Sequence, residues 1–159
     1  MSELTRGMQG YFKQSIKIKK ILLIFLTLFV ILSFALHFLK LPVNLVGWTT
    51  TFDVKHPEYI PFDADKQYGK KAGLDRVSLN YENSSSTLVV WVTNEIGWNN
   101  VSSWEEEMSL SDGTKAYYTE SDGIQIMSWR INNVEYAIDY TGSESLSRNE
   151  FIKVASLMK

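Results

Sequence analysis

Residues Ile21–Leu39 read ILLIFLTLFVILSFALHFL, an apolar run without a charged side chain. Only Thr27, Ser33 and His37 interrupt it. A helix rises about 1.5 Å per residue, so this run would reach about 28 Å, close to the ~30 Å hydrocarbon core of a bilayer. A helix also pairs its backbone N–H and C=O groups internally, as lipid requires. The run therefore predicts a single transmembrane helix over residues 21–40, with the lipid bilayer as its partner.

The charges beside this run predict its orientation. Residues 1–20 carry five basic side chains and one acidic side chain, whereas only Lys40 follows the run closely. Basic flanks stay on the cytoplasmic side of a membrane. We therefore expect a short basic cytoplasmic tail over residues 1–20 and a protein of the cell membrane whose C-terminus is extracytoplasmic. Pro42 cannot continue the helix, and residues 41–56 are expected to form a linker.

The composition of the remaining chain limits what it can bind. Residues 57–159 suffice for one small extracytoplasmic domain. Residues 41–159 carry ten basic and seventeen acidic side chains, and the chain has no cysteine. The acidic excess argues against binding to nucleic acid phosphates and predicts repulsion from an anionic membrane surface. The lack of cysteine excludes disulfides, thiolate metal sites and cysteine nucleophiles.

Alternating apolar and polar residues predict an antiparallel sheet of about five to six strands, arranged as a meander. Residues Leu74–Tyr81 and Thr87–Thr93 flank a turn cluster at 82–86 and form a predicted hairpin. Further strands are expected at 115–119, 124–131 and 134–140, separated by Asp-Gly and Asn-Asn pairs that tolerate positive φ. The less regular segments 64–70 and 102–107 are expected to hold short helices.

The C-terminus predicts a helix packed on one face of this sheet. Ser147 and Glu150 fit a capping box, and Leu146 with Phe151 fits a hydrophobic staple. The apolar residues recur at helical spacing, at Phe151, Val154, Ala155 and Met158. The sheet is the only large partner for this stripe, so the fold class is α+β.

The last third of the chain contains the segments IMSWRINNVEYAI at 126–138 and LSRNEFIKVASL at 146–157. With these segments it resembles an uncharacterised extracytoplasmic domain family of Gram-positive membrane proteins. In that family a W-x-x-x-x-x-x-Y strand pair precedes a capped helix, and members often lie outside a single transmembrane helix. Some members are anti-sigma-like membrane regulators. The resemblance implies a fold like that of lipoprotein carriers, a curved antiparallel sheet with helices in its concavity.

Aromatic residues in an irregular segment are the candidates for a binding surface. Trp98 and Trp104 lie there, and aromatic anchors dominate the energetics of interfaces. The alternative is that both belong to a flap that packs on the sheet. No catalytic residue, cofactor or metal site is predicted, because the sequence lacks the G-x-S-x-G, P-loop, H-E-x-x-H and CxxC motifs. The one histidine outside the apolar run, His56, lies beside a proline.

Three functional hypotheses follow from these features. The first is a membrane-anchored, non-enzymatic extracytoplasmic domain that binds a protein or an envelope ligand, in regulation or envelope sensing. The second is a domain that handles lipids or lipoproteins in an apolar concavity between sheet and helix, which rests on fold analogy alone. The third is a small cell-wall hydrolase that would use His56 or the acidic residues.

Overall fold

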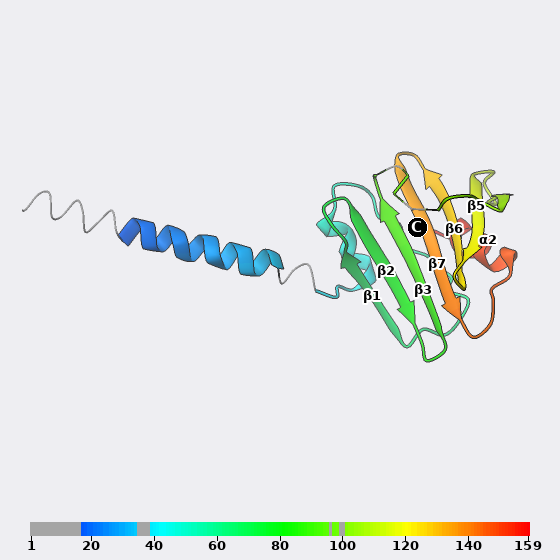
Figure 1. Cartoon of the computed structure of the whole chain (residues 1–159), viewed down its shortest axis with the longest axis horizontal. Helices are drawn as coiled ribbons and strands as arrows, with labels where there is room; N and C mark the ends of the chain where they lie inside the picture. The colour runs from blue at the N-terminus through cyan, green and yellow to red at the C-terminus, as the bar shows by residue number, and fades with distance from the viewer. Residues whose placement is uncertain (1–16, 35–38, 96, 99–100) are drawn as a thin grey trace, which may run out of the picture. The chain divides into compact units, whose positions relative to one another are not determined.

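The computed structural model describes residues 17–34, 39–95, 97–98 and 101–159 (Figure 1). The chain divides into two compact units, Met1–Phe38 and Leu39–Lys159. Every described residue that is buried lies between Val46 and Met158. The second unit therefore contains its own hydrophobic core and can be studied as a separate domain.

The first unit contains a helix over residues 17–34. The consecutive apolar residues 21–26 are each more than half exposed, so no side of this helix faces a protein core. Among the described residues, no helix is both long enough and apolar enough to cross a membrane. The span predicted over residues 21–40 includes residues 35–38, which lie outside the described residues, as does most of the predicted tail.

The second unit is built on one antiparallel sheet of seven strands, in the order β1-β2-β3-β7-β6-β5-β4. The strands are β1 Lys66–Lys71, β2 Arg76–Glu82, β3 Ser86–Thr93, β4 Glu106–Ser109, β5 Lys115–Ser121, β6 Ile124–Ile131 and β7 Val134–Gly142. The antiparallel sheet with a C-terminal helix is confirmed. The prediction of about five to six strands is wrong, because the sheet has seven.

The short helices expected at 64–70 and 102–107 are also wrong. The edge strand β1 takes up most of the first stretch, whereas residues 102–105 are irregular and the edge strand β4 begins at Glu106. Both strands are rich in charge, with three lysines in β1 and two glutamates in β4. Charged residues keep a sheet edge from pairing with other chains, but they hide the apolar alternation that identifies a strand. In β4 only Met108 is buried.

The prediction of a single meander is also wrong, because the strand order differs from the chain order. β1 to β3 form one meander and β4 to β7 form another, and β3 pairs with β7 over Ser86–Thr93. The connection from β3 to β4 therefore passes to the far edge of the sheet. β3 and β7 both carry several buried apolar residues. These residues are buried because both strands lie in the interior of the sheet, where each pairs with a neighbour on either side. Alternation identifies strands, but it does not identify their neighbours.

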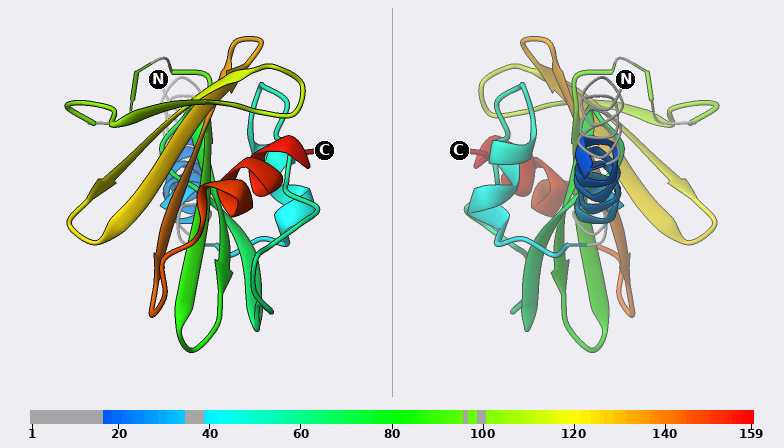
Figure 2. Two further views of the ribbon diagram at one scale, coloured as in Figure 1. Left: turned by 90° about the vertical axis from the view of Figure 1, so that its right-hand side faces the viewer. Right: turned by 90° about the vertical axis from the view of Figure 1, so that its left-hand side faces the viewer.

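The inner face of the sheet, which we define as the face that packs against α2 (Arg148–Ser156), carries the core. The 3-10 helix η1 (Val43–Thr49) lies on the same face (Figure 2). One row of paired residues crosses this face, formed by Gly69, Leu79, Val90, Ile138, Met127 and Tyr118. The apolar residues of this row are fully buried. Phe151 of α2 packs edge-on against Tyr118 at one end of the row, and Val46 of η1 lies against Gly69 at the other.

Residues 41–56, the expected linker, belong to the compact unit. They contain η1, whose Val46 is fully buried. Before it, the backbone N–H of Leu41 donates to the carbonyl of Gly69 at 2.9 Å, and the N–H of Gly69 donates back at 2.7 Å. The chain is therefore fixed to the middle of β1 from Leu41 onward.

The predicted start of α2 is confirmed in part. The hydroxyl of Ser147 accepts a hydrogen bond from the backbone N–H of Glu150 at 3.3 Å. The Glu150 carboxylate accepts instead from the hydroxyl of Tyr59 at 2.6 Å. The predicted apolar stripe is buried at Phe151, Val154, Ala155 and Met158.

We expect the substitution Ser147→Ala to lower the free energy of unfolding of residues 39–159 by about 0.5–2 kcal/mol, because it leaves a helix N–H without its cap. Urea titration followed by circular dichroism measures this loss. The matched variant Ser147→Asp keeps an acceptor at the same place and should unfold close to wild type. Equal stability of the alanine variant and wild type would contradict the capping role.

Candidate functional site

The outer face of the sheet, opposite α2, buries an unusual number of polar side chains. They are Ser78, Asn80, Thr93, Thr119, Ser128 and Glu135. The connection between β3 and β4 packs on this face, since the ring of Trp98 lies 5.5 Å from that of Trp91. A face that combines buried polar groups with aromatic cover is a candidate for recognition.

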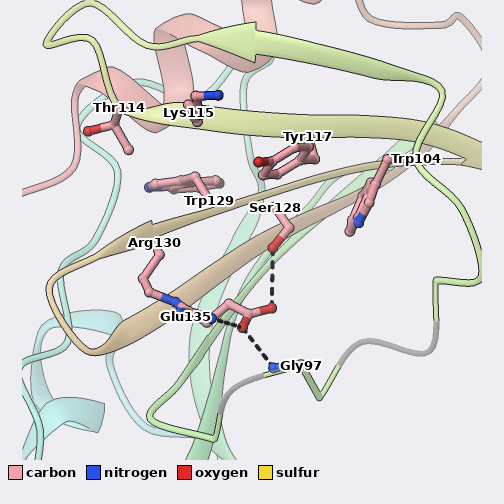
Figure 3. Close-up of a pocket in the computed structure, with 9 residues that line it drawn as sticks. All are labelled: Gly97, Trp104, Thr114, Lys115, Tyr117, Ser128, Trp129, Arg130 and Glu135. Carbon is pink, nitrogen blue, oxygen red and sulfur yellow. Dashed lines mark hydrogen bonds and ion pairs between the residues drawn. The ribbon is translucent and has the colours of Figure 1, made fainter.

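Glu135 of β7 is the centre of a hydrogen-bonded cluster on this face (Figure 3). Its side chain is 8% exposed, and its Oε2 lies 3.3 Å from Nη2 of Arg130. The same oxygen accepts from the backbone N–H of Gly97 at 3.0 Å, and Oε1 accepts from the hydroxyl of Ser128 at 3.4 Å. A carboxylate buried this far needs such partners. The cluster therefore attaches the β3–β4 connection to the sheet.

An open cavity of about 470 Å³ lies beside this cluster, with Glu135, Arg130 and Ser128 in its lining. Trp104 and Tyr117 also line it, with ring centroids 6.1 Å apart and planes inclined at 40°. Pockets of about 300–1,000 Å³ with an aromatic lining and a few polar groups are typical ligand sites. Figure 3 shows the residues that line this cavity, with Trp104 and Tyr117 on one side of Ser128 and the hydrogen-bonded Glu135 on the other.

A second cavity on the outer face is lined by Trp98 and Asp139. Trp98 is half-buried there, and the guanidinium of Arg76 lies 4.3 Å from its ring centroid. Its indole N–H is buried and finds no hydrogen-bond partner among the described residues. The structure thus places Trp98 and Trp104 on one face but at two different cavities. Their role as a binding surface stays a prediction.

Asp139 is the half-buried carboxylate of the second cavity. Burial raises its pKa above the ordinary 3.8, and the hydrogen bond donated by Nε1 of Trp91, at 2.7 Å, opposes this shift. Burial disfavours the charged form of a carboxylate, so the folded protein binds the proton more tightly than the unfolded chain does.

Wild type should therefore become less stable as the pH rises and Asp139 ionises, whereas the variant Asp139→Asn should not show this decrease. A raised pKa contributes stability that is complete below the unfolded value of 3.8 and is lost as the pH rises through the folded pKa. Urea unfolding at acidic and neutral pH should show wild type losing stability relative to the variant. The variant Asp112→Asn is the matched control with the opposite sign, since the Thr114 backbone N–H lowers the pKa of Asp112. A difference between wild type and Asp139→Asn that does not change with pH would contradict the assignment.

Sequence reasoning missed Glu135, Arg130 and Asp139. A signal existed for the first two, because the two-residue turn Asn132-Asn133 sets the β6–β7 register and places Arg130 opposite Glu135. Asn132 has a φ of 55°, as such a turn requires. The contact of Asp139 with Trp91 depends on the pairing of β3 with β7, and no local sequence pattern predicts that pairing.

Comparisons of the chain with models of protein families, with curated proteins and with solved structures find no match. The resemblance to the Gram-positive domain family therefore stays a prediction. Within the described ranges, no group of three or more His, Asp or Glu side chains is arranged to hold a metal ion.

Proposed function

We propose that this chain is a membrane-anchored extracytoplasmic domain that binds a protein or an envelope ligand without chemical turnover, in regulation or envelope sensing. The observation that carries the binding role is the open cavity on the outer face, which the aromatic rings of Trp104 and Tyr117 line together with the buried Glu135. Tyrosine, tryptophan and arginine are the residues that contribute most to binding energy at interfaces. Arg130, paired with Glu135, adds the third of these residue types to the lining.

The membrane anchor rests on the apolar run Ile21–Leu39 and on the helix that covers much of it, residues 17–34. The hydroxyl of Thr27 donates to the carbonyl of Leu23 at 2.9 Å, which satisfies the polar side chain within the helix itself. Lipid would also cover the apolar side chains that this helix exposes. The family resemblance implies the same arrangement of one helix and one external domain.

His56 is the residue that the alternative of a cell-wall hydrolase would use. Its Nδ1 lies 2.9 Å from the carbonyl oxygen of Lys159, so this nitrogen carries a proton and donates it to the main chain. His56 and Glu58 line a cavity near η1, but the described lining of that cavity contains no serine. A hydrolase would need a nucleophile or an activated water held beside such a base.

The packing of the inner face weighs against the alternative of a lipid or lipoprotein carrier. Such a carrier needs an apolar space between helix and sheet. Phe151 and Tyr118 are fully buried at this contact, and Trp129 is 2% exposed on the same face. These side chains fill the region where a lipid chain would lie.

Protease added to intact protoplasts tests the orientation. We expect the domain over residues 39–159 to be digested while the N-terminal tail is spared, because the basic flank keeps the tail inside. An epitope at each end reports the two outcomes separately. A domain that is protected in intact protoplasts and digested only after lysis would overturn the proposed location.

Affinity purification from native membranes tests the binding role. Wild type should recover a partner or ligand in stoichiometric amount, and Trp104→Ala should lose most of it, since the aromatic wall of the cavity is removed. The matched control is Leu157→Ala, which removes an exposed apolar side chain next to α2, away from the cavity. Equal recovery by all three proteins, or no stoichiometric species with wild type, would overturn the assigned site.

A further inference from the structure

The charge of the second unit is distributed unevenly along the chain. Residues 39–76 carry six basic and five acidic side chains, whereas residues 77–159 carry five basic and twelve acidic ones. Strand β1 alone has three lysines and no acidic residue. The acidic excess that predicts repulsion from an anionic membrane therefore belongs to the rest of the unit and not to the edge formed by β1.

Three lysines gather around one tyrosine at this edge. Lys66, Tyr68 and Lys70 alternate along β1 and share the outer face of the sheet. The Nζ of Lys40 lies 4.0 Å from the Tyr68 ring centroid, and the Nζ of Lys70 lies 5.3 Å from it. Within the described residues, none of these lysines forms an ion pair, whereas Arg76, Lys115, Arg130, Arg148 and Lys159 each do. The carboxylate of Glu82 belongs to the same group, since Glu82 pairs with Lys66 and accepts from the Tyr68 hydroxyl, so the three lysines exceed this acid and leave a net positive charge.

The chain itself holds this edge close to the end of the apolar run. Leu41 is hydrogen-bonded to Gly69 in the middle of β1, and Leu39 is the last residue of the run. Two residues span at most about 7 Å when fully extended. Wherever Leu39 leaves a bilayer, the middle of β1 must therefore lie near that point.

Two exposed apolar residues belong to the same region. Among the described residues of the unit 39–159, Leu74 (88% exposed) and Trp48 (84% exposed) are the most exposed large apolar side chains. Leu74 lies in the turn between β1 and β2, and Trp48 belongs to η1, which contacts β1. Tryptophan is enriched where protein meets the bilayer–water interface, because its ring is apolar and its N–H is polar.

We propose that the edge of the sheet formed by β1 rests on the anionic phospholipid headgroups of the bilayer that holds the anchor. This β1 surface consists of Lys40, Lys66 and Lys70 on the outer-face side of the edge, Trp48 of η1 on its inner-face side and Leu74 in the turn after β1. The proposal rests on the anchoring described under the proposed function. Each lysine near an anionic membrane surface contributes attraction, and the apolar side chains enter the headgroup region. Four strands separate β1 from β5, which carries Tyr117 of the first cavity. At about 4.8 Å per strand, this cavity is held well away from the lipid.

A single-cysteine probe tests the surface in the full chain, which has no cysteine of its own. The variant Leu74→Cys carries an environment-sensitive fluorophore and is reconstituted into vesicles of phosphatidylcholine alone, or of equal parts phosphatidylcholine and phosphatidylglycerol. We expect blue-shifted emission and quenching by brominated lipid in the anionic vesicles. High salt should reverse both, because it screens the attraction. The control probe Ser121→Cys, at the exposed end of β5, should report water in both vesicles.

Charge variants show which residues produce the shift. Lys66→Gln with Lys70→Gln should abolish the response of the Leu74 probe. Ser111→Glu with Ser145→Glu lowers the net charge equally at exposed positions outside the surface and should leave the response intact. Insertion of the chain with an unshifted Leu74 probe, or equal shifts at Leu74 and Ser121, would overturn the β1 surface alone. Failure of the chain to float with either vesicle would overturn the anchor and the surface together.

Discussion

Replacing Phe151 with alanine is expected to lower the free energy of unfolding of residues 39–159 by about 3–5 kcal/mol, the range for deleting a buried phenylalanine. Phe151 is fully buried, and its ring centroid lies 5.5 Å from that of Tyr118 in an edge-on contact. The substitution leaves a cavity between α2 and the inner face of the sheet, and the surrounding side chains relax only in part. Urea unfolding followed by tryptophan fluorescence measures the loss.

The control for this variant lies two residues earlier in the same helix. Asn149 is exposed, and Asn149→Ala should change the stability by no more than about 0.5 kcal/mol. Phe151→Leu keeps most of the apolar atoms and should lose less than the alanine variant. If Phe151→Ala and Asn149→Ala unfold at the same urea concentration, α2 does not pack on the sheet as described.

The part of this fold that the sequence predicts is the part with strong local patterns. The hairpin of β2 and β3 follows from alternation around a polar turn, and β6 and β7 follow from a two-residue turn whose Asn132 adopts positive φ. The start of α2 follows from the cap at Ser147. These signals depend on neighbours in the chain, so they survive without knowledge of the tertiary structure.

The features that the sequence does not predict depend on residues distant in the chain. The order of the strands follows from the pairing of β3 with β7, which joins Trp91 to the neighbourhood of Asp139 and brings Gly97 to Glu135. The candidate site follows from this pairing. Trp98 and Trp104 can be recognised in the sequence as aromatic residues of an irregular segment. Their separation into two cavities depends on how that segment crosses the outer face.

The contact between η1 and β1 illustrates the same limit at a single residue. Gly69 falls within residues 64–70, where the sequence predicts a short helix, whereas in the structure it is the place where η1 approaches the strand β1. A Cβ atom added at Gly69 would lie 2.5 Å from Cβ of Val46 and 2.9 Å from each of its methyl carbons. Real side chains do not approach so closely, and Val46 is fully buried, so it cannot rotate away into solvent.

The variant Gly69→Ala is therefore expected to lower the free energy of unfolding by about 1–3 kcal/mol, the usual loss from overpacking, because η1 must move away from β1. Hydrogen exchange at Leu41 and Gly69 should accelerate together, since their mutual hydrogen bonds lie beside the contact. The matched control Gln67→Ala changes an exposed residue of the same strand and should have little effect. In a double-mutant cycle with Val46→Gly, which removes the opposing Cβ, the loss caused by Gly69→Ala should shrink. Strictly additive losses in that cycle would show that the two residues do not meet, and the attachment of residues 41–49 to β1 would need another explanation.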